Sequence, residues 1–149
     1  MEHKYQSPWF REALELENEL EFKQLNSRET ADICIVGGGY TGLWTALKIK
    51  EKNPATNIIV IEKDLCGSGA SGRNGGCMIP LSSKFPAMKK IVGTKDAIRM
   101  VKASEEALNE IKQFCEINNL DVKIRINGIV YSATNNKHRG GFDNLLKDL

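Results

Sequence analysis

Three glycines at GxGxxG spacing, Gly37, Gly39 and Gly42, form the pattern that points most directly to chemistry. In such a motif the first glycine permits a tight turn. The second lets the backbone approach a pyrophosphate, and the third lets the next helix pack closely. The helix N-terminus then offers free N–H groups and a partial positive charge to the phosphates. Glu62, 20 residues beyond Gly42, can accept hydrogen bonds from ribose hydroxyls and would repel a 2′-phosphate, so NADP is disfavoured.

The elements around this motif have the order that a dinucleotide fold requires. Residues 32–36 form a short apolar run without alternation, which predicts a parallel strand buried on both faces. A helical pattern continues to about Lys52 and ends at Asn53-Pro54. Residues 58–61 give a second strand of the same kind, so 33–61 has the size of one strand–helix–strand unit. The alternative is a glycine turn in an unrelated α/β domain.

A second glycine-rich segment, residues 67–76, follows Glu62 closely. An ordinary NAD domain would enter another helix here. This segment instead has small residues, backbone amides and Arg73, which can lie against a large planar cofactor and donate to its phosphates. The loop therefore favours FAD over NAD, while a flexible surface loop remains the plain alternative.

These segments together resemble a known family. Residues 32–43, the strand ending at Glu62 and residues 69–76 are similar to the N-terminal part of FAD-dependent oxidoreductases of the D-amino-acid oxidase superfamily. The likeness is greatest to the amine-oxidising branch that includes gamma-glutamylputrescine oxidase. Residues 7–10, the helix over 103–115 and residues 125–128 also resemble that branch. The resemblance covers nearly the whole chain.

The resemblance implies FAD as the cofactor and hydride transfer from a substrate C–N bond to the flavin. It assigns one set of residues to the FAD pyrophosphate: Gly37, Gly39, Tyr40, Thr41 and Gly42. Glu62 would hold the adenosine ribose, with Lys63 nearby. A third set would line the path from pyrophosphate to isoalloxazine: Ser71, Arg73, Asn74, Gly75 and Gly76. It identifies no catalytic residue in this chain.

We therefore expect an α/β chain in three parts. Residues 1–30 are a lead-in segment, an amphipathic helix or extended arm without chemistry of its own. Residues 31–120 form an incomplete Rossmann-like FAD-binding domain that ends in a long helix over 95–117 with Thr94 as its cap. Residues 121–149 begin a substrate domain, with an antiparallel hairpin over 122–131 around the Asn127-Gly128 turn.

The length predicts a fragment. Members of the family that the chain resembles are more than twice as long, and two parallel strands with a hairpin are too little sheet for a doubly wound domain. An apolar stripe, Phe142, Leu145, Leu146 and Leu149, runs to the last residue without a cap. We therefore expect the 149-residue chain alone to be inactive. A non-catalytic dinucleotide-binding remnant and an NAD-linked dehydrogenase module are the alternatives.

The composition of the chain limits the classes of partner that it can bind. The 21 Lys and Arg residues against 19 Asp and Glu give a net charge of +2, too balanced for a strongly basic nucleic-acid binder. The sequence has neither an apolar run long enough for a membrane span nor a signal-peptide core, so we expect a cytoplasmic protein. Its cysteines (Cys34, Cys66, Cys77 and Cys115) lack metal-ligand spacing, and Cys34 is expected in the core. The expected partner is a small-molecule amine or amino acid.

Overall fold

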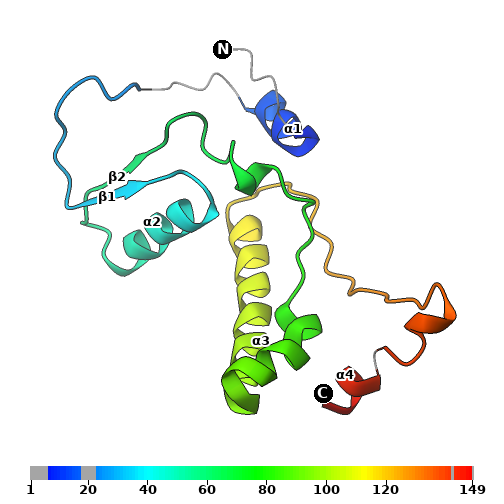
Figure 1. The fold of residues 1–149 in the computed structure, drawn as a ribbon. Helices are drawn as coiled ribbons and strands as arrows, with labels where there is room; N and C mark the ends of the chain where they lie inside the picture. Colours follow the sequence, from blue (N-terminus) through cyan, green and yellow to red (C-terminus); the bar gives the residue numbers. More distant parts are fainter. Residues whose placement is uncertain (1–6, 18–22, 142, 149) are drawn as a thin grey trace. The chain divides into compact units, whose positions relative to one another are not determined.

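The computed structural model describes residues 7–17, 23–141 and 143–148 (Figure 1). It divides into two compact units, Met1–Gly76 and Cys77–Leu149, which are described separately below. In the described part of the chain, no helix combines the length and the apolar character needed to cross a membrane.

The first unit is built on a parallel pair of strands. β1 (Ile33–Val36) and β2 (Ile58–Ile61) pair in parallel, with Ile33 opposite Ile58 and Val36 opposite Ile61. α2 (Tyr40–Lys52) connects them and packs against both strands. The helix ends where Asn53 donates its backbone N–H to the Ile49 carbonyl. The predicted strand–helix–strand unit is therefore confirmed.

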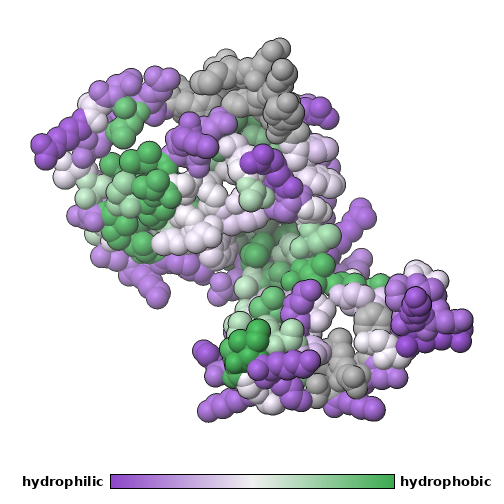
Figure 2. Space-filling view, in the orientation of Figure 1, coloured by the Kyte–Doolittle hydropathy of each residue, from purple (hydrophilic) through white to green (hydrophobic). Residues whose placement is uncertain are grey.

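The sheet of this unit is covered less than the sequence predicts. Ile33 and Ile35 are half-buried, whereas Cys34 and Val36 are exposed, with 84% of Val36 accessible. Figure 2 shows hydrophobic side chains at the surface over the β1–α2–β2 region. The prediction of a strand buried on both faces, with Cys34 in the core, is wrong for these residues. Their alternating burial shows that only one face of β1 is covered.

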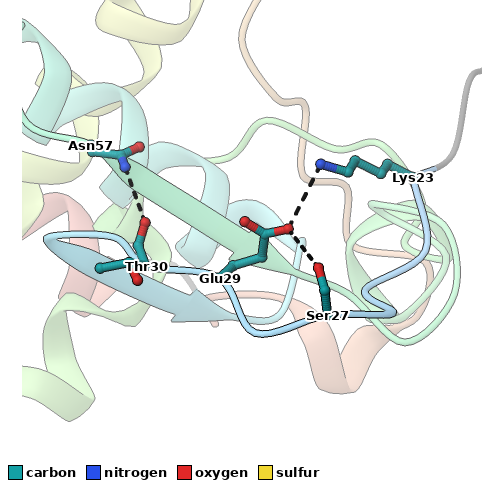
Figure 3. A network of polar contacts seen from close by, with 5 residues as sticks. All are labelled: Lys23, Ser27, Glu29, Thr30 and Asn57. Atoms are coloured by element: carbon teal, nitrogen blue, oxygen red, sulfur yellow. Dashed lines mark hydrogen bonds and ion pairs between the residues drawn. The ribbon is translucent and has the colours of Figure 1, made fainter.

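A polar network joins the chain before β1 to the start of β2 (Figure 3). Asn57 donates its side-chain amide to the Thr30 carbonyl at 3.3 Å. The Glu29 carboxylate accepts from the Ser27 hydroxyl at 3.1 Å and lies 3.8 Å from the Lys23 ammonium. These exposed contacts each contribute little, because solvent screens them. Among the contacts drawn in Figure 3, the hydrogen bond between Asn57 and Thr30 links the segment before β1 to the start of β2.

The second unit has a core formed by a helix that folds back on itself. η2 (Leu81–Lys84) leads into α3 (Phe85–Ile117), which is interrupted at Gly93, where φ is 79° and ψ is 167°. This break lies one residue before Thr94, the predicted cap, so the predicted helix over 95–117 is present but has a further segment before it. The break lets Phe85 pack with Ala97 and Val101; these three are the buried hydrophobic residues of the described chain.

The end of the chain departs from the prediction. Residues 122–131 form neither helix nor strand, so the predicted hairpin is wrong for this structure. A two-stranded hairpin is marginal without a surface to pack on, and Val130, at 93% exposure, has none. η3 (Asn136–His138) and α4 (Asp143–Asp148) follow. α4 agrees with the apolar stripe predicted there, although Phe142 and Leu149 lie outside the described residues.

The break at Gly93 yields a prediction about stability. Its backbone conformation is open almost only to glycine, and no heavy atom lies within 4 Å of where a Cβ would stand. Gly93→Ala should therefore lower the free energy of unfolding by about 1–3 kcal/mol through backbone strain alone. Urea unfolding followed by circular dichroism measures it, with Lys95→Ala on the same helix as control. Equal stability of both variants would show that packing of Phe85 does not require the break.

Candidate cofactor-binding site

A hollow opens where β1 ends and α2 begins. Its volume is about 360 Å³. The residues that line it come from the end of the strand, the glycine turn, the first turns of the helix and one position of the second glycine loop: Ile35, Val36, Gly37, Gly39, Tyr40, Thr41, Gly42, Thr45 and Ser71. Two segments separated by some thirty residues therefore contribute to one concave surface.

The glycines shape this hollow by lacking side chains. Gly37 has φ of +107°, a conformation that L-residues rarely adopt, and its N–H continues the ladder by donating to the Ile61 carbonyl at 2.8 Å. A Cβ at Gly42 would overlap the Gly37 carbonyl oxygen and lie 3.2 Å from Ile35 Cγ2. Only glycine at position 42 allows α2 to start this close to β1, which is the packing role that the motif predicts.

The first turn of α2 lines the hollow. Gly39 is the N-cap residue and provides no side-chain hydrogen bond to the helix. The Tyr40 N–H instead donates to Ser71 Oγ at 2.9 Å. A helix N-terminus with this arrangement suits an anionic ligand, because the amides carry partial positive charge. Within the described residues no group of three acidic, histidine or cysteine side chains could hold a metal.

Glu62 lies beside the glycine turn and is bound to it. One carboxylate oxygen accepts from the Gly38 N–H at 2.7 Å, and the other accepts from the Asp64 N–H at 3.3 Å. These two hydrogen bonds, that of Gly38 foremost, hold the pKa of Glu62 below its ordinary value of 4.5. An ionised carboxylate has about four acceptor positions. Glu62 can therefore hold the turn and still accept from a further hydroxyl group.

The second glycine loop is a folded structure held by its own polar side chains. It contains η1 (Ala70–Gly72). Arg73 donates through Nε to the Gly69 carbonyl at 3.2 Å. Asn74 donates to the Ser71 carbonyl at 2.6 Å and accepts from the Gly76 N–H at 2.8 Å. These contacts give the loop a defined conformation in which residues 73–76 are exposed.

The hollow brings together half of the predicted site residues. Those that line it are Gly37, Gly39, Tyr40, Thr41, Gly42 and Ser71. The others lie in the neighbouring turn and loop and do not line it: Glu62, Lys63, Arg73, Asn74, Gly75 and Gly76. Glu62 is nevertheless linked to the hollow through its bond to the glycine turn.

Sequence reasoning missed two groups of contacts. Gly38 is buried, its carbonyl accepts from the Gly67 N–H at 2.8 Å, and a Cβ on it would overlap the Cys66 sulfur. The two glycine segments are therefore joined directly. In addition, Ser7 donates its hydroxyl to the Gly72 carbonyl. The Ser7-Pro8 pair is a recognisable helix start, but nothing in the sequence shows what that start contacts.

Comparison with known proteins finds relatives that match parts of this chain. Three curated relatives illustrate the match. Gamma-glutamylputrescine oxidoreductase of Escherichia coli (strain K12) is 42% identical over 81 residues, covering 54% of this chain and 18% of the relative. Sarcosine oxidase subunit beta of Rhizobium meliloti (strain 1021) is 42% identical over 53 residues, covering 36% of this chain and 13% of the relative. L-2-hydroxyglutarate dehydrogenase of Indibacter alkaliphilus (strain CCUG 57479 / KCTC 22604 / LW1) is 31% identical over 103 residues, covering 68% of this chain and 23% of the relative.

The matches also define the extent of the likeness. The chain spans less than a quarter of the length of the curated relatives it matches. No solved structure matches it. Residues 32–149 match the family described as FAD dependent oxidoreductase. The matched range includes both glycine segments and the whole of the second unit. The chain therefore belongs to the FAD-dependent oxidoreductase family, whose cofactor is FAD.

Proposed function

We propose that this chain supplies the pyrophosphate- and ribose-binding part of an FAD site in an oxidoreductase that oxidises the C–N bond of a small amine or amino acid. The observation that carries the proposal is the joining of the two glycine segments in one hollow, where Tyr40 N–H meets Ser71 Oγ. The hydroxyl oxygen accepts from an amide of the kind that binds phosphate oxygens. The family membership of the chain supports FAD as the ligand.

Each proposed site residue has a role that fits its place. The N–H groups of Thr41 and Gly42, at the start of α2, would be available to a pyrophosphate without interference from side chains at Gly37 and Gly39. The Glu62 carboxylate accepts from the adenosine ribose while it holds the turn. Lys63 adds positive charge beside it. The second loop contributes the following residues toward the flavin: Ser71, Arg73, Asn74, Gly75 and Gly76.

The substrate class rests on the relatives. When bound, FAD accepts a hydride from the bond being oxidised. The names of two relatives, gamma-glutamylputrescine oxidoreductase and sarcosine oxidase, refer to amine compounds, which supports C–N oxidation. The third is named for a hydroxy acid, so C–O oxidation is the competing chemistry. The residues of this chain hold the cofactor and orient it, and we assign them no proton transfer.

We expect the purified 149-residue chain to bind FAD but not NAD⁺. We also expect it to release no peroxide with a panel of amines, amino acids and 2-hydroxy acids. The inactivity is expected because the chain spans less than a quarter of the length of the relatives it matches and because no catalytic residue is assigned to it. The visible spectrum and a peroxide assay measure these outcomes. Turnover would contradict the inactivity, and NAD⁺ binding without flavin would contradict the proposed cofactor.

Replacing the acid beside the turn should weaken FAD binding. Glu62→Gln removes the charge of a hydrogen-bond acceptor for ribose and loosens the Gly38 contact, so we expect FAD affinity to fall roughly tenfold. Flavin fluorescence quenching measures it. Glu51→Gln is the matched control, since Glu51 pairs with Lys48 on the exposed side of α2. Equal effects of the two substitutions would remove Glu62 from the site.

Protonation of Glu62 should weaken folding and FAD affinity at low pH. Because the pKa of Glu62 is lowered in the folded chain, its carboxylate stays charged below pH 4.5. Its contribution to folding and to FAD affinity is therefore complete above pH 4.5 and is lost only as the pH falls through the lowered value. The free energies of unfolding of the parent and of Glu62→Gln should differ at pH 6 and converge once the pH falls below the lowered pKa. A difference that vanishes already near pH 6 would contradict the lowered pKa.

The second glycine of the motif offers a steric test. A Cβ at Gly39 would lie 2.9 Å from Ser71 Oγ, and the branches of a valine would fill the hollow. Gly39→Val should abolish FAD binding. Gly69→Ala is the control, because no heavy atom lies within 4 Å of its Cβ position. Circular dichroism verifies that both variants fold equally. Flavin retained by a folded Gly39→Val variant would place the phosphates elsewhere.

A further inference from the structure

The N-terminal helix is attached to the second glycine loop. α1 (Pro8–Leu16) begins at Ser7, whose Oγ accepts from the Phe10 N–H at 3.1 Å as an N-cap. The same hydroxyl donates its proton to the carbonyl of Gly72. A single side chain therefore both starts the helix and fixes a backbone position of the loop.

A second contact reinforces the first. A Cβ at Gly72 would lie 3.0 Å from Phe10 Cδ2, and one at Gly67 would lie 3.5 Å from Phe10 Cε2. The ring of Phe10 therefore lies directly on two glycines of the loop. Because Gly67 has φ of +82°, the loop turns sharply where the ring covers it. The aromatic contact and the hydrogen bond act on the same short stretch of backbone.

The opposite side of this stretch faces the cofactor hollow. Ser71 precedes Gly72 within η1, and its Oγ accepts from the Tyr40 N–H at 2.9 Å. A displacement of Gly72 would move Ser71 with it, since both belong to one three-residue turn. η1 is thus held between α1 and the start of α2.

We propose that Ser7 and Phe10 are positioning residues of the cofactor site, which hold residues 67–73 in the conformation that places Ser71 at the hollow. This inference rests on the proposed function for its consequence, FAD affinity, but the conformation itself can be measured without FAD. It also gives the N-terminal segment, which the sequence alone leaves without a role, a part in cofactor binding. Neither residue touches the hollow, so both act through the loop.

Replacement of Ser7 by Asp or by Asn, two side chains of nearly the same shape, separates the two roles of Ser7. Ser7→Asp keeps an N-cap acceptor but has no proton to donate to the Gly72 carbonyl, whereas Ser7→Asn keeps both an acceptor and a donor. Hydrogen exchange of the FAD-free chain reports on residues 8–16 and 67–73 separately. We expect Ser7→Asp to leave exchange over 8–16 unchanged and to raise it over 67–73. Ser7→Asn should resemble the parent in both.

FAD affinity should fall in the variants whose hydrogen exchange over residues 67–73 is raised. Fluorescence quenching should show binding weakened about fivefold to tenfold in Ser7→Asp, while Ser7→Asn stays within about twofold of the parent. Phe10→Ala should have the same effect as Ser7→Asp, and Phe10→Leu, which keeps most of the apolar contact, should have less. If Ser7→Asp also loosens residues 8–16, the Phe10 pair decides the question.

The outcomes distinguish the two ideas. A parent chain that binds no FAD refutes the proposed function, while the exchange measurements still test the attachment of the loop. A parent that binds FAD, together with equal exchange and equal affinity for Ser7→Asp and Ser7→Asn and for Phe10→Ala and Phe10→Leu, overturns the positioning role alone.

Discussion

The first unit depends on the close approach between Gly42 and the Gly37 carbonyl. No side chain fits between them, so the helix can begin close to the end of the strand, and its first turn lines the hollow. The Glu62 carboxylate completes the arrangement from the second strand by accepting the Gly38 N–H. Strand, turn, helix and acid are thus fixed by a close backbone approach and a carboxylate–amide hydrogen bond, neither of which depends on a large core. This explains how a unit with little buried hydrophobic surface can still define a site.

The second glycine loop is held by the same kind of contact. It meets the first at the Gly38 carbonyl, which accepts from Gly67, and at Tyr40, which donates to Ser71. Its own polar side chains stabilise the turns around Asn74. Two segments rich in glycine would each be costly to order in isolation, because glycine loses the most conformational freedom on folding. Their mutual hydrogen bonds offset part of that cost.

Local patterns in the sequence predict the βαβ unit and the glycine turn, because their determinants lie within a few residues of one another. The bounds of α2 and the parallel pairing follow from apolar runs, from Asn53-Pro54 and from the GxGxxG spacing. Burial of Cys34 could not be predicted reliably, since it depends on what covers the other face of the sheet. The hairpin over 122–131 fails for a similar reason, because its turn signal is present but strand pairing also depends on what the side chains pack against, and Val130 is 93% exposed. The contact of Ser7 with Gly72 joins distant residues and leaves no local pattern.

That long separation also bears on the order in which the unit folds. Ser7 and Gly72 are 65 residues apart, whereas Ile33 and Ile58, the first pair of the sheet, are separated by 25. Closing the longer loop costs about 0.8 kcal/mol more chain entropy, and its contact is useful only once η1 has formed. The sheet and glycine turn can therefore nucleate first, and the N-terminal helix docks as a late step. During synthesis, residues 7–16 emerge before the loop that they contact, and they are then among the last to reach their native contacts.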